Sequence, residues 1–216
     1  MALYEDFLSR VLIEVPGCSE ISALQAVKDT CIEFCEKSLV LTRDHDPVTV
    51  QEGVVDYDLE PPSGYLVVKI MKAWLNHLPL GPLPPDVVSD AAVYNREFPE
   101  YQDAASTPTR FLQKDERTVS LWPMPDKDYV NGLTMRVALK PTRSSTSIED
   151  VVFEDYAETI ASGALGRLLS SVGKAYTNVS AAAMHKGMFI QGLNVARQRA
   201  THGHVRSNLS VKLVKL

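Results

Sequence analysis

The last 58 residues of this 216-residue chain contain no Asp and no Glu. Glu158 is the final acid, and the segment after it carries eight Lys and Arg residues, whereas the first 158 residues hold all 27 acids. The modest net charge of −5 therefore hides a strong charge separation along the sequence. Such a separation is typical of a subunit whose basic end binds an acidic partner, although a cationic helix with a frayed tail would give the same pattern.

Long apolar runs and cysteines are also scarce. No window approaches the ~20 apolar residues that a membrane span needs, and the first residues, MALYEDFLSR, carry acids where a signal peptide has a basic region. We therefore expect no membrane partner and no export by that route. The cysteines, Cys18, Cys31 and Cys35, are odd in number, which favours reduced thiols in a cytosolic compartment.

Helical periodicity is confined to the two ends of the chain. Apolar residues three or four apart predict a short helix from Tyr4 to Val15, and Ser19 is placed as the N-cap of a longer helix that reaches about Ser38. The same spacing predicts a helix from about 147 to 173 and a last helix over about 177–200. In the last helix we expect these side chains to face inward: Val179, Ala183, Phe189, Ile190, Leu193 and Ala196.

Small residues are frequent in the last two predicted helices. Gly costs about 1 kcal/mol against Ala inside a helix, so its repeated use needs a packing reason. We expect close packing of helix backbones, within the protein or against a neighbouring subunit, at Ala161, Gly163, Gly166, Gly187 and Gly192.

Between the helical ends lie short runs rich in Val, Leu, Tyr and Thr that are separated by Pro and Gly. Eleven of the 13 prolines fall between Pro61 and Pro141, a density that favours short antiparallel strands over βαβ units. A helical turn is expected near 86–95. The predicted strands are Pro47 to Val50, Gly53 to Leu59, Tyr65 to Trp74, Thr109 to Gln113, Thr118 to Trp122 and Leu133 to Leu139.

The order of these elements predicts an α+β protein. The N-terminal and C-terminal helices would form a helical bundle, with an inserted antiparallel β-rich, sandwich-like domain and an extended C-terminal arm. The expected boundaries are 1–38 and 148–203 for the helices of the bundle, 39–147 for the inserted domain and 204–216 for the arm.

No nucleophile elbow, phosphate-binding Gly-rich loop, dinucleotide fingerprint or zinc-ligand spacing occurs in the sequence. The runs Asp44-His45-Asp46 and His202-Gly203-His204 contain metal-ligand types, and Cys31 and Cys35 lie one helical turn apart. A polar turn, a helix end and buried small thiols are the favoured interpretations. We therefore predict no enzyme, no cofactor and no metal site, with an enzyme built around His45 as a weaker alternative.

The last 13 residues carry six Val and Leu residues among basic ones, and polar and apolar residues alternate from Ser210 to Leu213. Such a segment cannot bury its apolar side chains in itself. It predicts docking on a partner, by addition of a strand to a sheet edge or in a groove. A terminal strand on the chain's own β region is the alternative.

Several segments together resemble a known family. They are IEVPGCSEISALQAVKDTCIEFCEKS (13–38), YDLEPPSGYLVVKI (57–70), TVSLWPMPD (118–126), LTMRVALKPT (133–142) and YAETIASGALGRLLSS (156–171). Their layout is similar to that of the bacteriophage head-to-tail adaptor, or connector, family, to which the tail tubular protein A-like proteins are related. The resemblance extends over roughly Val11 to Ala200 and lies in patterns of Pro, Tyr and apolar spacing.

This resemblance implies a structural virion protein without catalysis, assembled in the host cytoplasm and located at the head-tail junction. Family members form rings, usually of twelve copies, beneath the portal, with helices toward the portal, β-rich parts toward the tail or nozzle protein, and DNA passing through as cargo. Carried onto this chain, the portal-binding arm and its base would comprise Arg197, Arg199, His202, His204, Val205, Arg206, Leu209, Val211, Lys212, Leu213, Val214, Lys215 and Leu216.

The alternative from another class is a nucleic-acid-binding protein that uses the basic C-terminal helix and tail. Its cations would neutralise phosphates, and binding would weaken steeply with salt. The tail lacks the interleaved aromatic residues of single-strand binders, and a pI near 5.6 is low for a dedicated nucleic-acid-binding protein. The adaptor is therefore the preferred interpretation.

Overall fold

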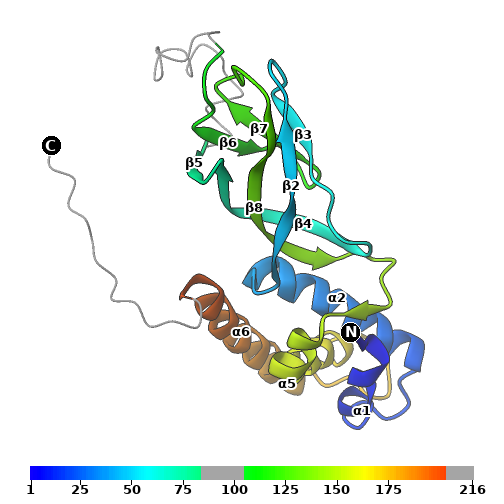
Figure 1. Ribbon diagram of the computed structural model, residues 1–216. Coiled ribbons are helices and arrows are strands. Elements are labelled where there is room, and N and C mark those ends of the chain that lie inside the picture. The colour runs from blue at the N-terminus through cyan, green and yellow to red at the C-terminus, as the bar shows by residue number, and fades with distance from the viewer. Residues whose placement is uncertain (84–104, 203–216) are drawn as a thin grey trace, which may run out of the picture. The chain divides into compact units, whose positions relative to one another are not determined.

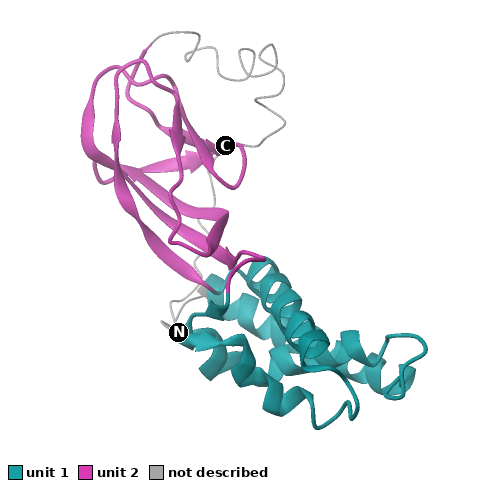
Figure 2. Cartoon of the chain, turned by 90° about the vertical axis from the view of Figure 1, so that its right-hand side faces the viewer, with its two compact units in different colours: residues 1–40, 146–216 teal, residues 41–145 magenta. Residues whose placement is uncertain are grey.

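The computed structural model describes residues 1–83 and 105–202 of the chain (Figure 1). Contacts within the chain separate two compact units (Figure 2). Unit 1 is formed by Met1–Val40 and Thr146–Leu216, and unit 2 by Leu41–Ser145. The helical turn expected near 86–95 and the arm 204–216 lie outside the described residues.

Unit 1 is built from helices and one short pair of strands. Ser19 caps α2, because its hydroxyl oxygen accepts the amide of Ser22 at 3.3 Å, and α2 ends at Leu39, whose φ of 57° is left-handed. Asn178 precedes α6, and its side-chain oxygen accepts the amide of Ala181 at 3.0 Å. The elements are β1 (Ala2–Leu3), η1 (Tyr4–Phe7), α1 (Leu8–Val11), α2 (Glu20–Ser38), β9 (Ser147–Ile148), α5 (Asp150–Leu168) and α6 (Val179–His202).

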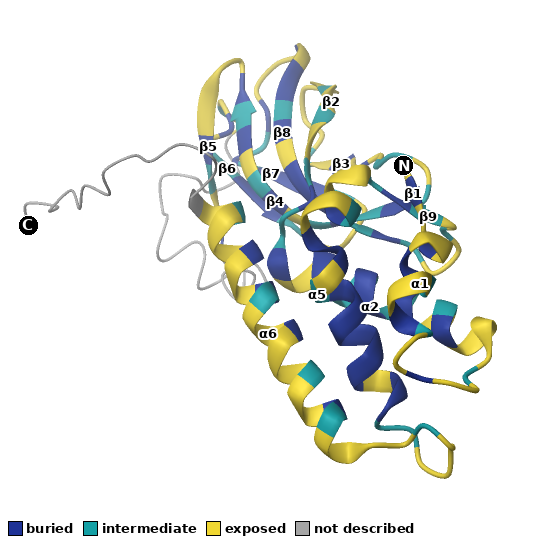
Figure 3. Cartoon of the chain, turned by 90° about the horizontal axis from the view of Figure 1, so that it is seen from below, coloured by how far each residue is buried: buried dark blue, intermediate teal, exposed yellow. Residues whose placement is uncertain are grey.

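The core of unit 1 lies around α5, which packs against α1, α2 and α6 (Figure 3). The ring of Phe34 on α2 lies with its centroid 5.1 Å from that of Tyr156 on α5 and 6.4 Å from that of Phe189 on α6. Phe34 is fully buried, so this aromatic cluster joins the three long helices. Helix α6 is covered on one side only, and its other side is exposed along its length (Figure 3).

Unit 2 is one seven-stranded sheet in the order β2-β8-β4-β5-β6-β7-β3. The long strand β8 pairs antiparallel with β2 on one side and with β4 on the other. The pair β5–β6 is parallel, with Gly81 opposite Arg110, and the other pairs are antiparallel. The strands are β2 (Thr42–Val50), β3 (Asp56–Asp58), β4 (Tyr65–Leu75), β5 (Leu78–Pro82), β6 (Arg110–Gln113), β7 (Thr118–Trp122) and β8 (Tyr129–Pro141).

Strand β3 is held at its edge of the sheet by a charged residue. The Asp56 carboxylate accepts hydrogen bonds from the Lys114 ammonium at 2.7 and 2.8 Å and from the Ser120 hydroxyl at 2.5 Å. These hydrogen bonds lower the pKa of Asp56 below its ordinary value, because they favour the ionised carboxylate, and the hydrogen bond from Lys114 contributes most.

The expected fold class, a helical bundle with an inserted antiparallel, sandwich-like domain, is wrong. The described residues hold four α-helices and a single seven-stranded sheet that curls into a nearly closed, barrel-like form. Two packed sheets would need a break in the strand order, whereas β5 pairs with β4 on one side and with β6 on the other and keeps the order continuous. The local strand pattern is the same in both arrangements, so alternation along the sequence does not distinguish them.

Candidate interaction surface

Three helix glycines mark the places where the helices of unit 1 approach most closely. A Cβ on Gly163 would lie 2.4 Å from Thr30 Cγ2 and 2.7 Å from Phe189 Cδ2, so this residue lets α5 fit between α2 and α6. A Cβ on Gly192 would lie 2.4 Å from Thr159 Oγ1. Gly166 is similar, with 2.9 Å to Lys186 Cγ on α6, and Ala161 on α5 is buried.

Gly187, in the middle of α6, has the opposite surroundings. A Cβ built on Gly187 meets no atom within 4 Å, so nothing in the described part of the chain requires a glycine there. Gly inside an exposed helix costs about 1 kcal/mol relative to Ala. The close packing predicted at Gly187 is therefore not found within the described part of the chain, and packing against a neighbouring subunit stays a prediction.

The exposed side of α6 around Gly187 carries apolar and uncharged polar residues; we call it the outer face. Met184, Met188 and Val195 have 58, 50 and 59% of their surface exposed, and Ile190 has 58%. Exposed helix faces normally carry charged residues. Its other members are the exposed residues Ser180, Ala183, Gln191, Asn194 and Gln198.

This face corrects part of the predicted inward set of the last helix. Phe189, Leu193 and Ala196 are buried as predicted, whereas Val179, Ala183 and Ile190 are exposed. The reason is that α6 packs on α5 and α2 from one side only, and this contact covers a stripe too narrow for all six residues.

The basic residues of α6 lie beside the outer face and differ in their partners. Arg199 donates to the Asp155 carboxylate at 2.8 Å and to the Tyr156 hydroxyl at 3.4 Å. Lys186 and Arg197 are exposed, and neither forms an ion pair with a residue in the described ranges. Of the predicted portal-binding base, Arg197 is therefore available on the surface, while Arg199 is engaged within unit 1.

The rest of the predicted portal-binding set is not placed. The side chain of His202, at the end of α6, is not described. The predicted arm residues lie outside the described residues: His204, Val205, Arg206, Leu209, Val211, Lys212, Leu213, Val214, Lys215 and Leu216.

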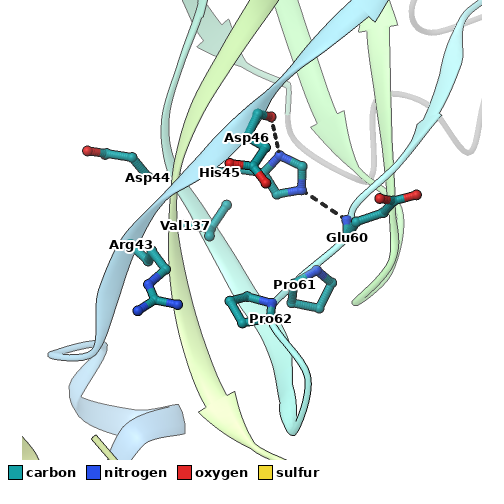
Figure 4. A pocket seen from close by; sticks show the side chains of 8 residues that line it. All are labelled: Arg43, Asp44, His45, Asp46, Glu60, Pro61, Pro62 and Val137. Atoms are coloured by element: carbon teal, nitrogen blue, oxygen red, sulfur yellow. Dashed lines mark hydrogen bonds between the residues drawn. The ribbon is translucent and has the colours of Figure 1, made fainter. Parts of the chain in front are cut away.

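In unit 2, the run Asp44-His45-Asp46 belongs to strand β2 and lines a cavity of about 370 Å³ (Figure 4). His45 Nδ1 donates to the Asp46 carbonyl at 2.7 Å, and Nε2 accepts the Glu60 amide at 2.9 Å. Both ring nitrogens are thus used by the backbone, and the Glu60 contact ties β2 to the segment after β3. Asp44 points away from His45 and lies 3.9 Å from Arg136.

These contacts give other roles to Asp44, His45 and Asp46, whose side chains are of the types that can bind a metal ion. Within residues 1–83 and 105–202, no three His, Cys, Asp or Glu side chains gather in a way that could hold a metal ion. His45 instead connects β2, one edge strand of the sheet, to the segment that follows β3, the other edge strand, where the barrel-like form is not closed by backbone pairing. The polar turn predicted for 44–46 is wrong, because these residues are part of β2.

Cys31 and Cys35 face the core of unit 1 from α2. Both are free and fully buried, and burial raises the pKa of Cys35 to about 12 and that of Cys31 well above its ordinary value. Thiols kept protonated in this way are poor nucleophiles and poor metal ligands. Their place in the structure is that of small apolar side chains.

What the described residues offer is an exposed, largely uncharged side of α6. No helix among the described residues combines the length and hydropathy of a membrane span. A family model described as SU10 adaptor protein matches residues 3–210, and the chain belongs to this family. The protein is accordingly a phage structural adaptor and a component of the virion. No curated protein matches the chain.

Proposed function

We propose that the protein joins the phage portal to the tail as a ring of copies, twelve in number, at the head-tail junction. The observation that carries the proposal is the family match, which extends over residues 3–210 and so includes both units and most of the basic C-terminal segment. In this role unit 1 faces the portal, unit 2 faces the tail or nozzle protein, and DNA passes through the ring as cargo.

The C-terminal arm, 204–216, docks on the portal in this proposal. It combines Val and Leu side chains with Arg206, Lys212 and Lys215 and follows a helix without acids. Burial of its apolar side chains would contribute at about 25 cal/mol per Å², and its cations would pair with acidic groups of the portal. The basic base of the arm continues onto α6, where Arg197 is exposed.

Truncation after Gly203 tests the arm directly. We expect the full chain to co-sediment with purified portal and the truncated chain to lose most of this binding. A variant in which Arg206, Lys212 and Lys215 are replaced by Ser should bind with a weaker dependence on salt, because fewer ion pairs form. Undiminished binding of the truncated chain would remove the arm from the mechanism, and failure of the full chain to bind would contradict the adaptor proposal itself.

Nucleic-acid binding by the basic C-terminal region is the competing function. The outer face of α6 argues against it, because the exposed residues of that face carry no charge for phosphate contacts. A gel-shift assay with double-stranded DNA at low salt separates the two: a shift that weakens steeply with added salt would favour nucleic-acid binding over the adaptor.

A further inference from the structure

The hydrogen bonds of His45 define the protonation state of its ring. Nδ1 lies 2.7 Å from the Asp46 carbonyl oxygen, which can only accept, so Nδ1 carries a hydrogen. Nε2 lies 2.9 Å from the Glu60 amide, which can only donate, so Nε2 offers its lone pair. The ring is therefore neutral, with its hydrogen on Nδ1 (Figure 4). A protonated ring has a hydrogen on both nitrogens and cannot accept the Glu60 amide.

The contact with Glu60 joins two parts of unit 2 that the sheet itself leaves apart. Strands β2 and β3 stand at opposite ends of the strand order, and segment 60–62, which follows β3, lines the cavity together with β2. The two residues after Glu60 are Pro61 and Pro62, and proline has no backbone N–H. The Glu60 amide is thus the sole backbone donor that segment 60–62 can offer to a neighbouring strand, and it is given to His45.

The cavity beside the ring is rich in charged side chains. Its charged lining residues are Arg43, Asp44, Asp46 and Glu60. Asp44 points away from His45 and lies 3.9 Å from Arg136 of β8. The carboxylates of Asp46 and Glu60 form no ion pair within residues 1–83 and 105–202. Because a carboxylate stabilises a nearby imidazolium, a charged ring has partners in this cavity that the neutral ring does not use.

We propose that His45 is a pH-sensitive clasp at the open edge of the barrel-like sheet. The neutral ring holds β2 to segment 60–62. Uptake of a proton at Nε2 releases the Glu60 amide and turns the ring toward the carboxylates of Asp46 and Glu60. Imidazoles ordinarily change charge between pH 5 and 8, so the clasp is closed at pH 8 and open at pH 5. This inference concerns the isolated chain and is independent of the portal.

The opening is confined to this edge of unit 2. The backbone ladders of β2 with β8 and of β3 with β7 contain no group that takes up a proton in this range. Asp56, whose pKa is lowered, stays ionised at pH 5 and keeps its hydrogen bonds with Lys114 and Ser120. Acidification from pH 8 to pH 5 therefore separates segment 60–62 from β2 without unfolding the sheet.

Nuclear magnetic resonance of the chain with ¹⁵N-labelled histidine tests the state of the ring. We expect His45 to carry its hydrogen on Nδ1 at pH 8 and hydrogens on both nitrogens at pH 5. The signals of His45 are identified by their absence from a His45→Gln variant. A ring with its hydrogen on Nε2 at pH 8, or a ring that is still neutral at pH 5, would overturn the inference.

Hydrogen exchange at the Glu60 amide measures the clasp itself. After correction for the intrinsic pH dependence of exchange, we expect its protection to fall about fivefold or more between pH 8 and pH 5, as for the loss of one hydrogen bond. Amides in the β4–β8 ladder should keep their protection. Equal protection of the Glu60 amide at both pH values, or a parallel loss throughout the β4–β8 ladder, would contradict a local opening.

Two histidine variants assign the effect. The side-chain carbonyl of His45→Gln can accept a hydrogen bond but takes up no proton, so protection of the Glu60 amide should not change with pH, whether the new side chain reaches the amide or not. The matched control is His77→Asn, which removes an exposed histidine at a φ of 68° that Asn tolerates, and it should keep the fall seen in the unaltered chain. A fall in His45→Gln as large as in the unaltered chain, or its loss in His77→Asn, would refute the assignment to His45.

Discussion

Replacing Gly163 by Ala introduces a methyl group where α2, α5 and α6 meet. The new Cβ would lie 2.4 Å from Thr30 Cγ2 and 2.7 Å from Phe189 Cδ2, both well inside van der Waals contact. Thr30 cannot easily turn away, because its hydroxyl donates to the Ala26 carbonyl at 2.7 Å. Phe189 is buried and belongs to the aromatic cluster. The helices must therefore move apart.

The magnitude follows from two opposing contributions. Overpacking of a core costs about 1–3 kcal/mol, whereas Ala in place of Gly inside a helix gains about 1 kcal/mol. Contacts of 2.4 and 2.7 Å place the overpacking cost in the upper part of its range, about 2–3 kcal/mol, so we expect Gly163→Ala to lower the free energy of unfolding by about 1–2 kcal/mol. For a protein of this size, each kcal/mol corresponds to a shift in Tm of about 2–4 °C.

Gly187→Ala is the matched control, because the same substitution falls in open space on α6. It should raise the free energy of unfolding of the isolated chain by up to about 1 kcal/mol, through helix propensity alone. Thr30→Ser, which removes the methyl group but keeps the hydroxyl, should recover part of the loss in the Gly163→Ala variant.

The assay is urea and thermal unfolding followed by far-ultraviolet circular dichroism, which reports on the helices of unit 1. The reasoning requires opposite signs for the two glycine substitutions. If Gly163→Ala were as stable as the unaltered chain, or if Thr30→Ser made that variant less stable still, the close packing described for α5 would be refuted.

Three further results are expected. The pKa of Asp56 is lowered in the folded state, so its stabilisation is present above the unfolded pKa near 3.9 and is lost as pH falls through the folded pKa. Asp56→Asn should therefore make the urea midpoint decline less steeply on acidification. An unchanged decline would exclude this role for Asp56. Iodoacetamide at pH 8 should modify one thiol of the folded chain and all three in urea, with mass spectrometry finding Cys31 and Cys35 unmodified before unfolding. His45→Ala should lower the free energy of unfolding by about 1 kcal/mol, because the hydrogen bond with the Glu60 amide is lost, and should leave assembly on the portal intact. Loss of assembly in a folded variant would instead assign His45 a functional role.

Local signals in the sequence are sufficient to predict an element that has its own capping or turn residues at its ends and a clear apolar periodicity between them. Ser19 and the apolar stripe after it predicted α2 to within a residue, and the strand predicted over 118–122 is confirmed. Strand β2 was predicted only from Pro47, although it begins at Thr42. Because the first half of β2 is charged and largely exposed, it lacks the alternation of polar and apolar residues that identifies a strand. This half is a strand because it pairs with β8.

The surface was harder to predict than the core. The apolar residues of α6 were assigned to the interior because a sequence does not say how many neighbours a helix has. Ile190 and Leu193 are equally apolar, yet one is exposed and the other buried. A signal was present in Met184, Gly187, Met188 and Val195, which follow helical spacing without a charge among them. It identifies an exposed face only once the packing of α6 on α5 is known.

The pairing of distant segments also dictates an order of events during synthesis. Every strand of the seven-stranded sheet lies before residue 142, so the sheet has all its partners once β8 has left the ribosome. Helix α2 is made earlier but must wait for α5 and α6, more than a hundred residues downstream, before its apolar stripe can be covered. The nascent N-terminal helix thus spends translation with Phe34 and its neighbours unprotected, and this is the interval in which a chaperone would engage the chain.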